Sequence, residues 1–244
     1  MKQIGLWILI FGLTFIGCHQ STTTKENQNK INAPAEVQVD STNDKNGAQS
    51  EISVLGEIHA YDTIDKDEIQ TLIRQVLNWA NSKNSIDLIP AIADSKDSFF
   101  IGFDMDKHKQ NLIKLKATNF FATEFINNYD QIILTLDRKL RNGEYGQWST
   151  GDQPSFIFAS DVDPWTHNQD VPYDKPNPLD YIEVQVVQLD QNKGELDWKW
   201  GNLPLNLYTD TGWKDFKYRF RVVKEDGKWK IAYLWGFDFK EGTR

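Results

Sequence analysis

The stretch YRFRVVKEDGKWKIAYL, residues 218–234, decides the fold, because it contains two alternating strands and a tight turn between them. Asp226-Gly227 at its centre is a strong signal for a two-residue turn of the primed type. That turn pairs apolar residues across the strands: Val222 with Ile231, Phe220 with Tyr233, Tyr218 with Trp235, and Phe216 with Phe237. Since side chains alternate between the faces of a strand, all eight are expected on one face, with Lys217, Arg219 and Arg221 on the other.

The same period of two occurs upstream of this hairpin. Ile182, Val184 and Val186 alternate with more polar residues. After the turn at 192–194, Leu196, Trp198 and Trp200 do the same. Such alternation indicates half-buried strands, so the part of the chain after residue 156 is expected to form an antiparallel meander.

Helical spacing dominates the preceding part. Asp65 and Glu68 have the spacing of a capping box, which places a helix start at Asp65. Apolar residues then recur on one helical face: Ile69, Leu72, Ile73, Val76, Leu77 and Ala80. A second apolar run extends from Phe121 to Leu140 and stops at Asn142-Gly143, where glycine suits a left-handed cap.

A third helix is expected over residues 106–115. The preceding Asp104-Met-Asp106-Lys-His108 has a carboxylate, carboxylate, imidazole order that resembles metal-ligand spacing. The favoured interpretation is simpler: Asp106 caps the helix, since acidic residues stabilise a helix N-terminus, and His108 is an exposed residue of the first turn.

Helices followed by a meander predict one α+β domain over residues 65–244, with the N-terminal helices packed on one face of a curved antiparallel sheet. FFATEFINNYDQI, residues 120–132, and the closing hairpin resemble the cone-shaped domains of the nuclear-transport-factor-2-like group, especially its bacterial lipoprotein members. Many members of that group bind small ligands in the cone, a few are enzymes, and others mediate contacts. The resemblance therefore implies a fold and leaves the activity open.

The first eighteen residues predict that the protein is exported from the cytoplasm and anchored to a membrane. A short basic start, the apolar run from Ile4 to Ile16, and Gly17 form the layout of a signal peptide over residues 1–17. Phe15-Ile16-Gly17-Cys18 resembles a bacterial lipobox, which implies cleavage before Cys18 and lipidation of its thiol. The alternative is a retained membrane helix, but the apolar run has about 13 residues where about 20 are needed.

The expected product is a lipid-anchored protein of the cell envelope, with the membrane as a partner. His19 stands where aspartate retains some bacterial lipoproteins in the inner membrane, which favours the outer membrane. Residues 18–64 comprise the lipidated Cys18 and a stretch that is expected to act as a flexible tether. Its last part, residues 51–64, is more apolar and either packs on the domain as a leading strand or stays loose.

The net charge of the chain limits the kinds of partner that it is expected to bind. The chain has 27 basic and 35 acidic residues, a net charge of −8, which argues against nucleic acid. Cys18 is the single cysteine, so no intramolecular disulfide can form. Aromatic residues on the strands, such as Trp198, Trp229 and Trp235, either line a pocket for an apolar ligand or stack against sugar rings, or they fill the core.

The loop containing Asp161, Asp163, Trp165 and His167 is the best candidate site. It lies in the segment 153–180, which holds five of the eight prolines. Asp161, Asp163 and Asp170 offer oxygen ligands for calcium, and His167 a transition-metal ligand or a base. The spacing does not match a calcium-binding loop, so no metal or cofactor is assigned. The alternative is a surface loop with Trp165 as a packing plug.

Common catalytic motifs are absent: no Gly-x-Ser-x-Gly, no P-loop and no His-Glu-x-x-His. The leading hypothesis is a domain that binds a ligand or an envelope partner without chemistry. The alternative is a hydrolase or lyase that acts in the cone, with Asp161, Asp163 or His167 as acid or base. A third possibility is a purely structural envelope protein.

Overall fold

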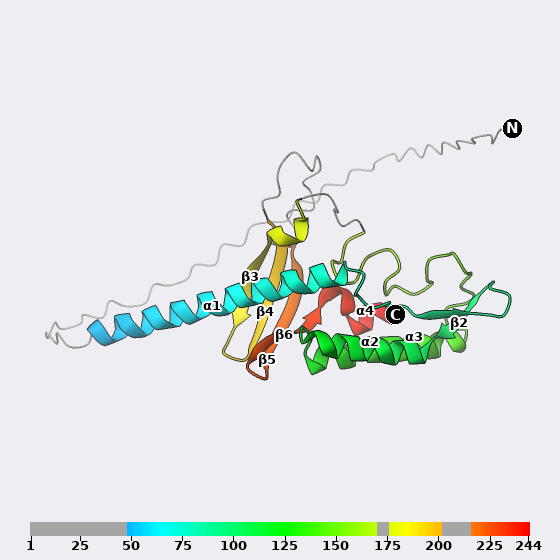
Figure 1. Cartoon of the computed structure of the whole chain (residues 1–244), viewed down its shortest axis with the longest axis horizontal. Coiled ribbons are helices and arrows are strands. Elements are labelled where there is room, and N and C mark those ends of the chain that lie inside the picture. The colour runs from blue at the N-terminus through cyan, green and yellow to red at the C-terminus, as the bar shows by residue number, and fades with distance from the viewer. Residues whose placement is uncertain (1–47, 170–175, 202–215) are drawn as a thin grey trace, which may run out of the picture. The chain divides into compact units, whose positions relative to one another are not determined.

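The computed structural model describes residues 48–169, 176–201 and 216–244, and their side chains from residue 63 onward (Figure 1). The signal peptide, Cys18, most of the tether and Asp170 lie outside these residues. Among the helices that are described, none is long and apolar enough to cross a bilayer.

The main sheet has four antiparallel strands in the order β3-β4-β5-β6. Their bounds are Ile182–Leu189, Lys193–Trp200, Tyr218–Glu225 and Lys228–Leu234. Two short strands, β1 (Ala91–Ala93) and β2 (Phe100–Phe103), form a separate antiparallel pair. With the helices, this confirms the predicted α+β class and the antiparallel sheet.

The turn of the closing hairpin and the pairs next to it are as predicted, but the register farther from the turn is not. Asp226 and Gly227 both have positive φ, 56° and 73°, as a primed turn requires. Val222 pairs with Ile231, and then the register shifts, so that Arg221 pairs with Tyr233 and Ala232 is left as an extra residue in β6.

This bulge overturns the other predicted pairs and the single apolar face. Phe220 pairs with Leu234. Trp235 lies beyond the strand in the 3-10 helix η3 (Trp235–Phe237) and is 41% exposed, and Phe216 is 60% exposed. The physical reason is that the bulge allows the adjacent residues Ile231 and Ala232 both to be buried.

Helix α1 spans Ala48–Ala80, so the predicted start at Asp65 is wrong, and residues 48–64, assigned to the tether above, are helical. Asp65 does not cap the helix. Its carboxylate accepts hydrogen bonds from Trp229 Nε1 at 2.8 Å and from Lys224 Nζ at 3.0 Å, and so joins α1 to the hairpin.

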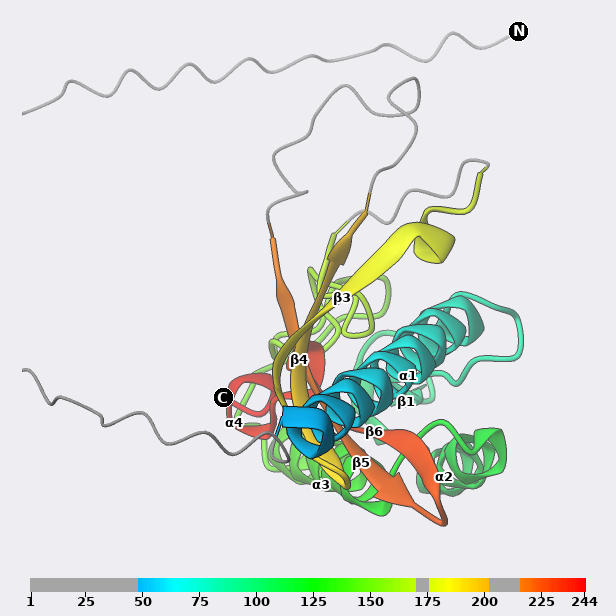
Figure 2. The same cartoon turned by 90° about the vertical axis from the view of Figure 1, so that its left-hand side faces the viewer.

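Helices α2 (Met105–Thr118) and α3 (Thr123–Arg141) confirm the other two predicted helices, with Gly143 in the left-handed region at φ 74°. The predicted cap is wrong: the carboxylate of Asp104, not Asp106, accepts from the first-turn amides. His108 is buried rather than exposed, and its Nε2 lies 2.8 Å from Asp130 Oδ1 of α3. This pair explains the burial, because it links the two helices, which contact each other (Figure 2).

Short helices complete the described part: the 3-10 helix η1 (Pro178–Tyr181) before β3 and α4 (Phe239–Gly242) at the end. The core is rich in aromatic rings. Rings from four separate segments contact one another within it: Trp79, Phe121, Phe125, Trp165 and Phe237. The hydrophobic side chains of the helices and of the sheet form one continuous cluster.

Candidate functional site

Asp163, one of the predicted site residues, organises its own loop. Its Oδ1 accepts hydrogen bonds from the main-chain N–H groups of Trp165 at 2.7 Å and Thr166 at 3.3 Å, and its carbonyl accepts from His167 N at 2.7 Å. Burial raises the pKa of the Asp163 carboxyl, and the two hydrogen bonds oppose that rise. The Asp163 side chain thus holds a turn of its own loop.

Trp165 lies in the core. It is 5% exposed, and its ring contacts those of Trp79, Phe121, Phe125 and Phe237 at centroid distances of 4.6–6.1 Å. Trp165 therefore has the packing role that the sequence offers as the alternative to ligand binding. Asp163 and Trp165 therefore fix the loop onto the domain.

Asp161 and His167 do come together, in a pocket of about 190 Å³ that Trp235, Asp238 and Glu241 also line. The His167 ring stacks on Trp235 at a centroid distance of 4.5 Å. Burial lowers the pKa of His167, and the charge of Glu241 opposes this. Burial thus favours the neutral form of the imidazole.

Ser160 also lines this pocket, but it is not prepared as a nucleophile. Its hydroxyl donates to the carbonyl of Ile157 at 2.9 Å, and no hydrogen bond joins it to His167 within the described part of the chain. In the same residues, no group of three or more His, Cys, Asp or Glu side chains is arranged to hold a metal ion.

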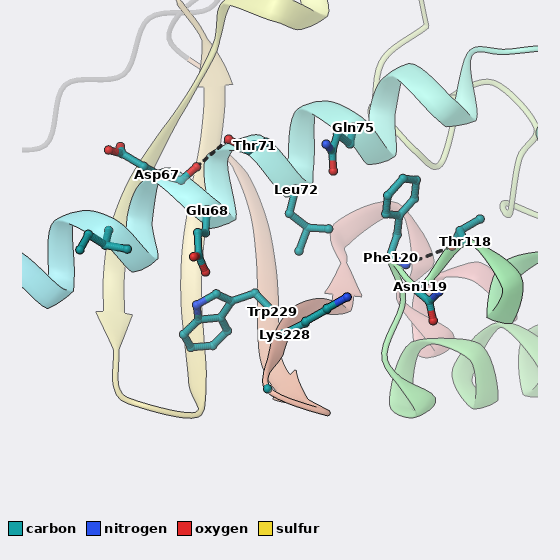
Figure 3. A pocket seen from close by; sticks show the side chains of 12 residues that line it. Asp67, Glu68, Thr71, Leu72, Gln75, Thr118, Asn119, Phe120, Lys228 and Trp229 are labelled. Atoms are coloured by element: carbon teal, nitrogen blue, oxygen red, sulfur yellow. Dashed lines mark hydrogen bonds between the residues drawn. The ribbon is translucent and has the colours of Figure 1, made fainter.

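A larger hollow of about 720 Å³ lies between α1, the link from α2 to α3, and the tip of the β5–β6 hairpin (Figure 3). We call it the hairpin groove. It is lined by residues of three separate segments: Ile64, Asp67, Glu68, Thr71, Leu72, Gln75, Thr118, Asn119, Phe120, Gly227, Lys228 and Trp229.

The apolar wall of the hairpin groove comes from Leu72, Phe120 and Trp229 (Figure 3). Trp229 is held firmly, since its indole N–H donates to Asp65 and the Lys224 ammonium lies 4.6 Å from its ring centroid. Leu72 and Trp229 are buried, and Phe120 is half-buried. The rigid wall is thus shared by the helix, the hairpin and the link.

The polar side of the groove is different, because its side chains are unpaired. The side chains of Asp67, Glu68, Gln75, Asn119 and Lys228 make no hydrogen bond or ion pair with any described residue. They offer two carboxylates, two amides and one ammonium to whatever enters. These groups can recognise a ligand without any rearrangement of internal hydrogen bonds.

The hydroxyls of the groove are already engaged. Thr71 Oγ1 donates to Asp67 O at 2.9 Å, and Thr118 Oγ1 donates to Leu115 O at 2.7 Å. No histidine or cysteine is among the lining residues. The two threonine hydroxyls of the groove are therefore not prepared as nucleophiles.

Sequence reasoning missed the hairpin groove because its residues become neighbours only in the folded chain. The sequence places Glu68 in a capping box, and it marks Trp229 only as one of several aromatic residues on the strands. Comparison of the chain with protein-family models, with curated proteins and with solved structures finds no match.

Proposed function

We propose that this chain is a cell-envelope lipoprotein whose α+β domain binds a ligand in the hairpin groove without catalysing a reaction. One observation carries the proposal: an apolar wall of Leu72, Phe120 and Trp229 faces a set of unpaired polar side chains, and the nearby threonine hydroxyls already donate to helix carbonyls. Binding sites commonly combine an apolar wall with a few orienting polar groups.

The proposed domain is a cone of the nuclear-transport-factor-2-like type, with α1 against the concave side of the sheet. Support comes from contacts between α1 and the edge strand β3. Arg74 Nε donates to Ile182 O at 2.9 Å, and Gln70 Oε1 accepts from Val184 N at 3.0 Å. Because Phe125 and Trp198 are almost completely buried in the interior, the ligand site lies at the rim, in the hairpin groove.

The proposed location in the cell envelope is based on Phe15-Ile16-Gly17-Cys18, which resembles a lipobox. We expect the chain isolated from the membrane fraction of a bacterial host to begin at Cys18 and to carry a diacylglycerol and acyl chains. Intact mass spectrometry measures this. A Cys18→Ala variant should lose the lipid mass, and an unmodified, uncleaved wild-type chain would contradict the lipoprotein assignment.

The groove itself is tested with small organic probes. We expect phenol and acetamide at millimolar concentration to shift the backbone amide signals of Gln75, Asn119 and Trp229 in a saturable way, because aromatic and amide groups match its two sides. Two-dimensional NMR of the chain measures the shifts. Saturable shifts confined to the pocket of His167 and Trp235, with none in the groove, would contradict the proposed site.

A further inference from the structure

We propose that the ligand of the hairpin groove is a neutral saccharide, held by side chains through its hydroxyls and its apolar C–H faces. The inference rests on the proposed function and narrows it to one chemical class. It depends on three properties of the groove: the hydrogen bonding of its main chain, the net charge of its lining, and the presence of aromatic rings beside side-chain amides.

The main chain beside the groove offers only a short open edge, which argues against recognition by strand addition. Ile231 N donates to Phe120 O at 2.8 Å, and Ala122 N donates to Ile231 O at 2.8 Å, so the link from α2 to α3 covers this edge of β6. Lys228 and Trp229 lie opposite Glu225 and Lys224 at the tip of the hairpin. The part of the β6 edge that the link leaves open runs only from residue 228 to residue 230, which is too short a row of donors and acceptors for an extended peptide. Side chains must therefore recognise the ligand.

The charge of the groove disfavours anions and purely apolar ligands. Asp67 and Glu68 carry two carboxylates, and Lys228 is the single basic residue in the lining. A phosphate or carboxylate ligand would meet a net negative wall. A lipid tail would cover unpaired carboxylates and amides without replacing their bonds to water, and burying such groups unpaired is costly.

Saccharide hydroxyls match the polar groups that remain. A sugar hydroxyl both donates and accepts hydrogen bonds, and so do the side-chain amides of Gln75 and Asn119. The sugar hydroxyls can also donate to the carboxylates of the groove. Phe120, half-buried, offers a ring surface beside the buried Leu72 and Trp229 for the C–H face of a sugar. The volume of about 720 Å³ lies within the range of about 300–1,000 Å³ that is usual for ligand sites.

The test uses three neutral trisaccharides, maltotriose, cellotriose and chitotriose, which differ in stereochemistry and substituents. Each is titrated into the chain and followed by NMR of the backbone amides. We expect at least one to bind saturably, with shifts at Gln75, Asn119 and Trp229.

The double variant Gln75→Ala with Asn119→Gly removes both amides. Glycine is used at 119 because Asn119 has φ 57°, a conformation that glycine adopts without strain. We expect affinity to fall about tenfold, equivalent to about 1.4 kcal/mol. The matched control, Asn127→Ala with Gln147→Ala, removes two exposed amides that do not line the groove, and should leave affinity unchanged.

The outcomes separate this inference from the proposed function. If phenol and acetamide bind in the groove but no trisaccharide does, the saccharide inference is wrong and the binding function stands. If neither kind of probe binds there, both are wrong. Trisaccharide binding that maps elsewhere, or that survives the double variant at full affinity, also overturns the inference.

Discussion

Replacing Trp165 with alanine should lower the free energy of unfolding by about 3–5 kcal/mol, the usual cost of deleting a buried tryptophan or phenylalanine side chain. The indole is 5% exposed and contacts four other aromatic rings of the core. Its removal leaves a cavity among rings from α1, α3 and the C-terminal segment. Urea denaturation followed by circular dichroism measures the loss.

Trp235→Ala is the matched control. Trp235 is 41% exposed, whereas Trp165 is 5% exposed, so removal of Trp235 forfeits less buried area together with its stacking on His167. We therefore expect a smaller loss than for Trp165→Ala. Equal losses for the two variants, or a Trp165→Ala variant as stable as the wild type, would show that Trp165 does not hold the loop to the core.

Gly236→Ala should also be strongly destabilising. A Cβ at Gly236 would lie 2.1 Å from the carbonyl oxygen of Pro164, so the loop and the C-terminal segment would have to separate. Overpacking of this kind costs about 1–3 kcal/mol and sometimes more. A drop in the melting temperature, measured by calorimetry, reports the effect.

Gly242→Ala provides the comparison for Gly236→Ala within the same segment. A Cβ at Gly242 would lie 3.4 Å from the Phe158 side chain, at the close end of ordinary contact. We therefore expect a smaller loss of stability than for Gly236→Ala. If Gly236→Ala were as mild as Gly242→Ala, the close approach of Pro164 would not be a constraint on this part of the fold.

Local signals in the sequence predicted much of the secondary structure. Alternation located β3 to β6, and helical spacing located α2 and α3. Asp226-Gly227 predicted the turn, because a primed turn needs positive φ at both positions, which these residues tolerate. Such signals lie within a few residues of one another, and they need no knowledge of the rest of the chain.

The bulge at Ala232 could not be predicted in the same way. It accompanies the pairing of Ile231 with Phe120 and Ala122, more than a hundred residues earlier in the chain. His108 was misjudged for a similar reason, since its burial depends on Asp130 of a different helix. Long-range partners decide both features, and the local pattern does not contain them.

The candidate sites also divide into one that local sequence signals indicate and one that depends on contacts between distant segments. Proline content and acidic residues pointed to the loop of Asp161 and His167, which do share a pocket. The hairpin groove gave no local signal, because Gln75, Asn119 and Trp229 belong to segments that are distant in sequence. A structure was needed to show that these side chains face one hollow.

The central claim is that the hairpin groove is the ligand site, and filling the groove tests it most directly. Thr71→Trp places an indole in the groove, whereas Lys66→Trp places one on an exposed position of the same helix outside the lining. NMR titration with phenol, acetamide and the three trisaccharides compares the two variants. We predict that Thr71→Trp loses the saturable shifts at Gln75 and Asn119 and that Lys66→Trp retains them. Undiminished binding to the filled groove would contradict the claim.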